Sequence, residues 1–86
     1  MYEEDIRKLL TTKKLIIGED EVLKHARKGD LAKVYHASNA NKLTIKDLQK
    51  YGKISNFEVL DTNVPNDDLG TVCKKPFSIS TIGVLQ

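Results

Sequence analysis

A basic, aromatic and conformationally stiff segment near the C-terminal end is the first candidate for chemistry, and it consists of Lys74, Lys75, Pro76 and Phe77. Lysines can contact phosphates, and a proline or an aromatic ring can lie against a base, so this combination suits a nucleic acid. Basic surface loops are common, however. Taken alone, the segment is better explained as a solvated loop with ordinary lysines.

The second candidate follows a short apolar run and precedes a predicted helix, and it consists of Gly18, Glu19, Asp20 and Glu21. A helix N-terminus carries unpaired N–H groups and the positive end of the helix dipole, and a glycine there lets a backbone approach a ligand. Three carboxylates would repel phosphate but could accept hydrogen bonds from the amino and imino groups of bases. Their position alone favours a simpler interpretation, in which the acidic residues cap the helix dipole.

Other polar and basic side chains leave alternatives open. Asn39 and Asn41 lie in a loop after a predicted strand, where an asparagine can bond a base edge or hold a turn equally well. Scattered lysines could contact phosphates or could simply keep the predicted helices soluble. These lysines are Lys24, Lys28, Lys42 and Lys46.

No combination of residues predicts catalysis, a metal site or a cofactor. His25 and His36 are not spaced as metal ligands with another His, Cys or Glu. Cys73 lies beside two lysines, which could lower the pKa of its thiol, but no base can be assigned to it. A small buried hydrophobic residue is therefore the favoured interpretation of Cys73. Asp67 and Asp68 are interpreted as a solvated helix start, and we expect a protein that is not an enzyme.

The composition is that of one small globular domain, residues 1–86, with 40% hydrophobic and 30% charged residues. Its net charge of +2 permits an RNA partner without demanding one. The single cysteine excludes a disulfide within the chain and fits a reducing, intracellular setting. No apolar run approaches the roughly 20 residues that cross a bilayer. The first five residues, Met-Tyr-Glu-Glu-Asp, are acidic where a secretory signal would be basic, so no targeting segment or membrane contact is expected.

Apolar periodicity and turn residues predict an alternation of helices and strands. The predicted helices cover residues 2–10, 19–28, 44–52 and a short stretch from 69, and the predicted strands cover residues 13–17, 31–37, 57–60 and 77–85. Thr44 with Asp47 predicts a capping box at the start of the third helix, and Gly52 predicts its end. The last strand ends apolar on both faces, which is typical of a strand inside a sheet. The alternation predicts an α/β fold, a three-layer α/β/α sandwich.

Three motifs give the chain a resemblance to a known family. They are Ile17-Gly18-x-x-Glu21-Val22-x-Lys24, Ala37-Ser38-Asn39 and Leu69-Gly70-Thr71-Val72-Cys73-Lys74-Lys75-Pro76-Phe77. Together with the element order, they resemble the small ribosomal and kink-turn RNA-binding proteins, the group of the L-thirty-e and L-seven-Ae ribosomal proteins. The resemblance runs over about residues 13–85, and the short loop at residues 74–77 is more similar to the L-thirty-e branch.

The resemblance implies a three-layer α/β/α sandwich with a four-stranded mixed sheet. It implies an archaeal-type, non-enzymatic structural protein of the large ribosomal subunit, cytoplasmic on the ribosome and monomeric when free. Its implied partners are ribosomal RNA with a kink-turn or similar bent internal loop, and neighbouring ribosomal proteins. The RNA-binding residues that it implies are Gly18, Asp20, Glu21, Lys24, Asn39, Lys74, Lys75, Pro76 and Phe77.

Each of the three motifs has an implied role. Residues 18–24 would read tandem sheared G·A pairs, residues 75–77 would lie against an extruded nucleotide, and Asn39 would add a polar contact. Two alternatives stay open. One is a kink-turn protein of another ribonucleoprotein particle. The other is a protein-interaction module of the same fold, which the acidic residues 18–21 favour and the lysines at 74 and 75 oppose.

The chain departs from the family pattern at three positions. Asp20 stands where relatives usually carry Asn or Lys, Lys74 stands where many carry Gly, and Ser78 stands where some carry a basic residue. Asp20 removes an amide donor or a cation. RNA binding is therefore expected to be weaker than in the strongest binders of the family, or shared with other ribosomal surfaces.

Overall fold

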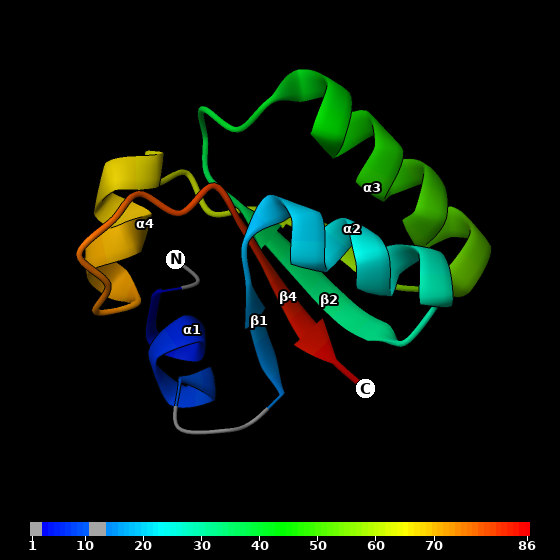
Figure 1. Ribbon diagram of the computed structural model, residues 1–86, viewed down its shortest axis with the longest axis horizontal. Helices are drawn as coiled ribbons and strands as arrows, with labels where there is room; N and C mark the ends of the chain where they lie inside the picture. Colours follow the sequence, from blue (N-terminus) through cyan, green and yellow to red (C-terminus); the bar gives the residue numbers. More distant parts are fainter. Residues whose placement is uncertain (1–2, 11–13) are drawn as a thin grey trace.

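The structure, a computed structural model, describes residues 3–10 and 14–86. In these ranges helices and strands alternate along the chain (Figure 1). The helices are α1 Glu3–Leu9, α2 Glu19–Lys28, α3 Lys42–Ser55 and α4 Asn66–Val72. The strands are β1 Leu15–Ile17, β2 Leu31–His36, β3 Glu58–Asp61 and β4 Thr81–Leu85. The alternation confirms the predicted α/β fold.

The described strands form one mixed sheet in the order β1-β4-β2-β3. Strand β4 is antiparallel to both β1 and β2, whereas β2 and β3 are parallel. The predicted interior position of the last strand is confirmed, since β4 lies between β1 and β2. Its register pairs Ile82 with Ile17 on one side, and Thr81 with His36 on the other. The beginning of β4 therefore lies beside the ends of β1 and β2.

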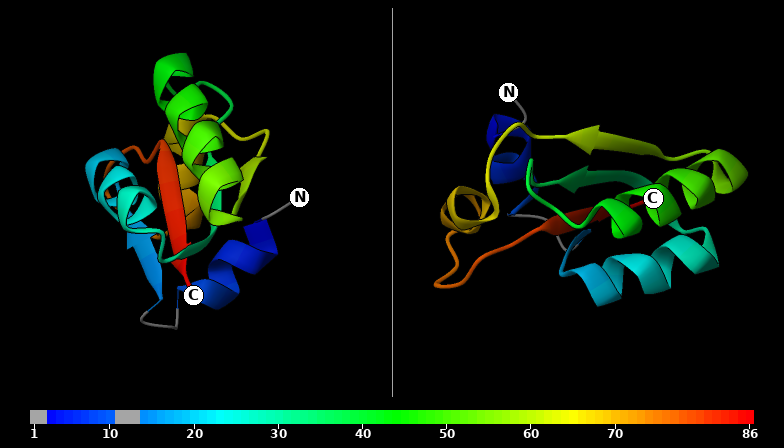
Figure 2. Two further views of the ribbon diagram at one scale, coloured as in Figure 1. Left: turned by 90° about the vertical axis from the view of Figure 1, so that its right-hand side faces the viewer. Right: turned by 90° about the horizontal axis from the view of Figure 1, so that it is seen from above.

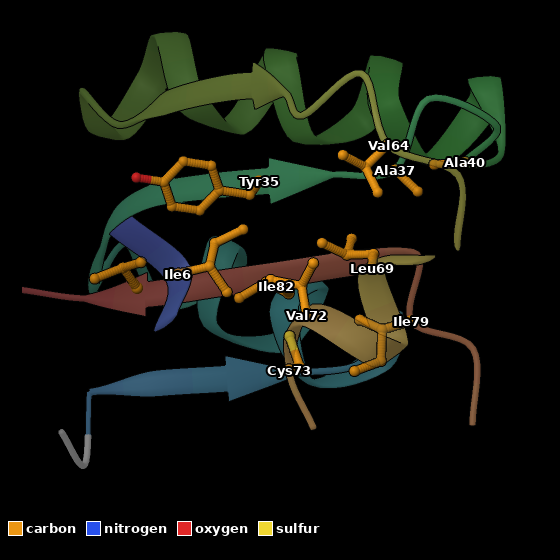
Figure 3. Packing of buried hydrophobic residues seen from close by; sticks show 11 residues of the cluster. Ile6, Tyr35, Ala37, Ala40, Val64, Leu69, Val72, Cys73, Ile79 and Ile82 are labelled. Atoms are coloured by element: carbon orange, nitrogen blue, oxygen red, sulfur yellow. The ribbon is translucent and has the colours of Figure 1, made fainter. Parts of the chain in front are cut away.

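Helices cover both faces of the sheet, which gives the predicted three layers (Figures 1 and 2). Alternating side chains of the strands point to opposite faces. Val34 packs with residues of α2 and α3, whereas its neighbour Tyr35 packs with residues of α1 and α4. The core under α1 and α4 is drawn in Figure 3, and it includes Ile6, Leu69 and Ile82.

The predicted bounds of the third helix were wrong at both ends. Helix α3 begins after Asn41, whose side chain accepts a hydrogen bond from the Leu43 N–H at 2.9 Å, so Asn41 is the N-cap in place of Thr44. Gly52 does not end the helix but lies inside it. A side chain at Gly52 would meet the Phe57 carbonyl oxygen at 2.7 Å, so this glycine is required by close packing.

Two further bounds differ from the prediction. Helix α4 begins at Asn66 rather than at residue 69, and Asp67 and Asp68 lie exposed in its first turn, which confirms their interpretation as a solvated helix start. Strand β4 begins at Thr81 rather than at residue 77, because backbone groups of residues 79 and 80 bond to the start of α4 and to the loop after β2 rather than to a neighbouring strand. The Ile79 N–H donates to the Asn66 carbonyl at 3.1 Å, and the Ser80 carbonyl accepts from the Ala37 N–H at 2.8 Å. The other bounds agree within two residues, and residues 2 and 11–13 of the predicted first helix, turn and strand lie outside the described ranges.

Candidate nucleic-acid interface

The three sequence motifs meet at one end of the sheet, where β1 and β2 finish and β4 begins (Figure 1). The Gly18 N–H donates to the Thr81 carbonyl at 3.0 Å, and the Ala37 N–H donates to the Ser80 carbonyl at 2.8 Å. The segment before β4 is therefore bonded to the segments that follow β1 and β2. We call this region, residues 18–24, 37–41 and 66–78, the loop end.

The first part of the loop end is the start of α2. Gly18 precedes the helix with φ of 113°, a left-handed conformation that side chains rarely adopt. The Glu19 carboxylate accepts a hydrogen bond from the Thr44 hydroxyl of α3, so this residue joins two helices. Asp20, Glu21 and Lys24 are exposed instead. Of the three carboxylates, two can therefore meet a ligand while the third stabilises the fold.

Asn39, in the second part, is engaged by another residue of the chain. Its amide donates to Asn66 Oδ1 at 3.1 Å, and its Oδ1 accepts from the Asn66 N–H at 2.9 Å. The side chain thus satisfies an N–H in the first turn of α4, which has no partner within the helix. Of the two interpretations of Asn39, the structure shows the one in which it holds the local backbone. The amide is exposed and carries a second hydrogen, so contact with a base edge stays a prediction.

The third part, residues 74–77, is exposed yet firmly held. The Lys74 N–H donates to the Thr71 carbonyl and the Lys75 N–H to the Gly70 carbonyl, both at 3.0 Å. A Cβ added to Gly70 would lie 2.1 Å from the Phe77 carbonyl oxygen, so only glycine lets the segment return this close to α4. Ile79 then enters the core between the sheet and α4 (Figure 3). The Phe77 side chain is 56% exposed.

A shallow hollow of ≈ 340 Å³ lies beside this segment. Its wall includes the exposed Phe77 and Pro76, together with Ser78 and Asp67, and the Ser78 hydroxyl donates to Asp67 Oδ1 at 2.6 Å. An aromatic ring and a proline next to an open hollow can support a flat base by stacking. The fixed backbone means that little ordering would be required on binding.

The charges of the loop end are mostly negative. Its five carboxylates are Glu19, Asp20, Glu21, Asp67 and Asp68, and its three lysines are Lys24, Lys74 and Lys75. An excess of carboxylates weakens attraction for phosphates but leaves acceptors for base amino and imino groups. Contacts with bases therefore suit this end better than contacts with the sugar–phosphate backbone.

At position 74, the departure from the family pattern, a lysine in place of a glycine, strains the backbone. The φ of Lys74 is 57°, in the left-handed region that glycine adopts without strain. The glycine that the resemblance implies at this position is thus explained by the turn that ends α4. A lysine here adds a cation and strains the turn.

Cys73 is buried at the end of α4, which confirms its interpretation as a small hydrophobic residue. Burial raises the pKa of the Cys73 thiol, and the Lys75 cation opposes that rise only in part. The thiol is therefore protonated at neutral pH and is a poor nucleophile.

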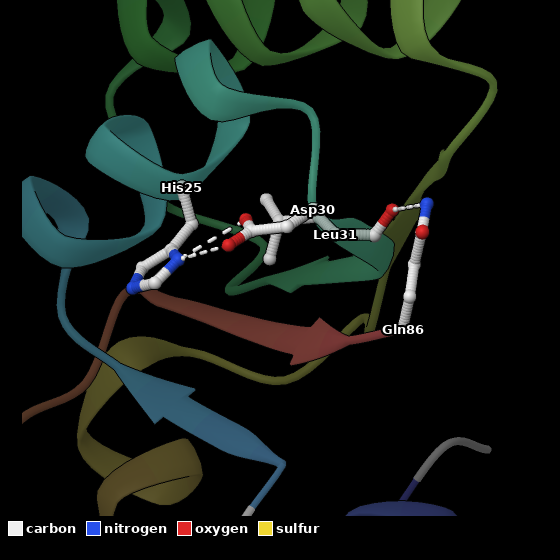
Figure 4. A network of polar contacts seen from close by, with 4 residues as sticks. All are labelled: His25, Asp30, Leu31 and Gln86. Carbon is white, nitrogen blue, oxygen red and sulfur yellow. Dashed lines mark hydrogen bonds and ion pairs between the residues drawn. The ribbon is translucent and has the colours of Figure 1, made fainter.

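The two histidines are used in contacts within the chain. His25 Nδ1 lies 2.9 Å from Asp30 Oδ2 at the end of α2, in the polar network that Figure 4 shows near Gln86. The buried His36 donates its Nδ1–H to the Ala37 carbonyl at 2.9 Å. Within residues 3–10 and 14–86, no three His, Cys, Asp or Glu side chains are grouped as metal ligands. The helices of the same ranges are all too short or too polar to cross a membrane.

Sequence reasoning missed the partners that fix the loop end, namely Asn66 and Thr44. Asn66 follows Pro65, and proline beside a polar residue is a helix-start signal that could have placed α4 earlier. The Glu19–Thr44 bond joins residues 25 positions apart, and no local pattern announces it.

Comparisons with known proteins agree on one family. A family profile described as "Ribosomal protein L7Ae/L30e/S12e/Gadd45 family" matches residues 1–86. The Large ribosomal subunit protein eL30 of Sulfurisphaera tokodaii is 38% identical over 85 residues, which are 99% of this chain and 80% of that protein.

Solved structures share the fold. A protein of unknown function from Bacillus halodurans superposes with a TM-score of 0.85 at 22% identity, over 99% of this chain and 84% of the other. The 15.5kD RNA binding protein of Giardia lamblia gives a TM-score of 0.77 at 14% identity, over 98% and 70% of the two chains.

Proposed function

Because this chain belongs to the Ribosomal protein L7Ae/L30e/S12e/Gadd45 family, we propose that it is a structural protein of the large ribosomal subunit that binds bent, kink-turn-like ribosomal RNA. The similarity to the Large ribosomal subunit protein eL30 of Sulfurisphaera tokodaii, which extends over 99% of this chain, supports the ribosomal part of the proposal. One observation supports the RNA-binding part, namely that three separate segments converge on one end of the sheet and expose Phe77 there.

The proposed mechanism assigns base contacts to the loop end. Asp20 and Glu21 accept hydrogen bonds from the amino and imino groups of purines in the sheared G·A pairs, while Lys24, a turn later in α2, contacts a phosphate. Phe77 and Pro76 support the extruded nucleotide on the far side of the hollow. Sequence-specific RNA recognition generally targets such unstacked bases, since the deep groove of a regular RNA duplex is closed to side chains.

The remaining contacts are lesser ones. Lys74 and Lys75 approach the phosphates that flank the extruded nucleotide, and Asn39 offers its second amide hydrogen. Gly18 lets the RNA approach the backbone, because nothing lies within 4 Å of where its Cβ would be. The role is non-enzymatic and places the protein on cytoplasmic ribosomes, as a monomer before assembly and beside ribosomal proteins afterwards.

A second candidate is a protein-interaction module of the same fold. The excess of carboxylates at the loop end favours this candidate, because phosphates are repelled there. A kink-turn protein of another ribonucleoprotein particle would use the same surface as the proposed ribosomal protein.

The test titrates the purified protein with a kink-turn RNA and with the same RNA whose G·A pairs are replaced by Watson–Crick pairs. Both titrations are made at one stated salt concentration, since affinity for RNA depends strongly on salt. The proposal expects at least tenfold tighter binding of the kink-turn RNA. Equal affinity for the two RNAs would contradict specific recognition and would favour the protein-interaction module.

A further inference from the structure

Helix α3 carries a row of basic side chains that the loop end does not include. The row, here called the lysine ridge, consists of Lys42, Lys46, Lys50 and Lys53, all exposed. The helical period of 3.6 residues gathers these lysines in a stripe about 80° wide and about 16 Å long. Asp47, the acidic residue of the helix, falls outside this stripe.

The ridge is held on a rigid support. The opposite face of α3 is buried through Thr44, Leu48 and Gly52, and both ends of the helix are capped. Asn41 caps the start, and Asn56 adopts the left-handed conformation that ends the helix. None of the four ridge lysines forms an ion pair with another residue of the described ranges 3–10 and 14–86.

An open groove of ≈ 780 Å³ runs beside the ridge, between α3 and β3. Three ridge lysines line it, and its floor is apolar, formed by Gly52, Phe57 and Val59. A surface that combines a row of cations with an apolar floor matches an RNA strand, whose phosphates can follow the row while a ribose or an unstacked base covers the floor.

The position of the ridge makes it continuous with the loop end. Helix α3 starts directly after residues 37–41 and runs back along the sheet away from the loops (Figure 1). An RNA that is bound at the loop end and continues past Lys42 would therefore follow the ridge. The loop end itself has more carboxylates than lysines, so attraction for a polyanion must come from another surface.

We propose that the lysine ridge of α3 is a second RNA-binding surface, which contacts phosphates without regard to sequence and supplies electrostatic affinity. The choice of RNA over an acidic protein rests on the proposed function. The contacts themselves do not depend on kink-turn recognition, so the two proposals can fail separately.

The experiment compares two doubly substituted full-length proteins of equal net charge. One carries Lys46→Gln and Lys50→Gln in the ridge, and the control carries Arg7→Gln and Lys33→Gln, which are exposed residues of α1 and β2. Each protein is titrated with the kink-turn RNA and with its G·A-replaced counterpart, from low to moderate salt. Circular dichroism confirms that each protein is folded, which exposed substitutions are expected to preserve.

We expect the ridge variant to bind both RNAs about tenfold more weakly at low salt, with the ratio of the two affinities unchanged. Loss of two phosphate contacts should also reduce the slope of log K against log salt by about 1.5. The control variant should change affinity by less than threefold. A ridge variant that binds both RNAs like its control, as expected if the ridge served an acidic protein, would overturn the proposal whatever the kink-turn discrimination proves to be.

Discussion

The loop end and the lysine ridge differ in charge, in support and in what they can recognise. The loop end has five carboxylates and three lysines on three converging segments, whereas the ridge has four lysines on one helix. Contacts with phosphates position an RNA, and contacts with bases specify it. Under the two proposals, the lysine ridge would supply affinity for RNA and the loop end would supply specificity, so one small domain can place these two properties on different surfaces.

Substitution of Gly70 by alanine should break the loop end most severely. The new Cβ would lie 2.1 Å from the Phe77 carbonyl oxygen, so residues 74–77 must move. We expect a loss of about 2–3 kcal/mol in the free energy of unfolding, measured in urea, as for other overpacked sites. Discrimination of the kink-turn RNA should disappear, while the salt slope that depends on the ridge should remain. Thr71→Ala, at the exposed neighbouring residue, is the control, and a Gly70→Ala protein of unchanged stability would contradict the close approach.

Removal of the Phe77 ring should affect specificity without affecting stability. The ring is more than half exposed, and stacking of a base on an aromatic side chain contributes about 1–3 kcal/mol. We expect Phe77→Ala to weaken binding of the kink-turn RNA at least tenfold, with the same salt slope as the unchanged protein. Leu43→Ala removes an even more exposed apolar side chain from α3 and serves as the control. Equal effects of the two substitutions would remove Phe77 from the proposed site.

Neutralisation of one carboxylate at the loop end and of one on α3 should have smaller effects that differ between the two regions. Asp20→Asn at the loop end keeps one acceptor oxygen for a base, removes a charge that repels phosphates and adds an amide donor, so binding of the kink-turn RNA should tighten about threefold, with a gain in discrimination. Asp47→Asn on α3 should tighten binding of both RNAs equally. Titration of the two variants separates these outcomes. A uniform gain from Asp20→Asn would mean that Asp20 acts only through charge.

The smallest expected effect comes from the strained turn after α4. Lys74→Gly should increase the free energy of unfolding by about 0.5 kcal/mol, because relief of the left-handed conformation is partly offset by the greater freedom of glycine in the unfolded chain. Its loss of one cation should lower the salt slope of RNA binding by less than one. Lys75→Gly, whose φ is not positive, should destabilise the protein instead.

The sequence predicted most of the fold because its signals were local. Apolar periodicity and the glycines at 18 and 29 placed α2 correctly at both ends. The bounds of α3 and α4 were wrong because distant contacts decide them. Gly52 lies inside α3, where its missing side chain leaves room for the Phe57 carbonyl, and the N–H of Asn66 at the start of α4 donates to the side chain of the distant Asn39.

The candidate site was predictable in part for the same reason. The residues of the loop end could be named from motifs, but their engagement with one another could not, since the Asn39–Asn66 pair spans 27 positions. The lysine ridge was not predicted. The sequence analysis named Lys42 and Lys46 only among scattered lysines. Because α3 begins at Lys42 and not at Thr44, the four lysines of the ridge lie on one face of a single helix.

The hydrogen bond from Thr44 to Glu19 has a consequence for geometry. It fastens the first turn of α3 to the first turn of α2, so the row of cations keeps one fixed direction relative to the loops. The angle between the lysine ridge and the loop end is therefore fixed, and an RNA could contact both surfaces only if its two arms meet at a matching angle. The protein would then select an RNA by the angle of its bend rather than by contacts with additional bases.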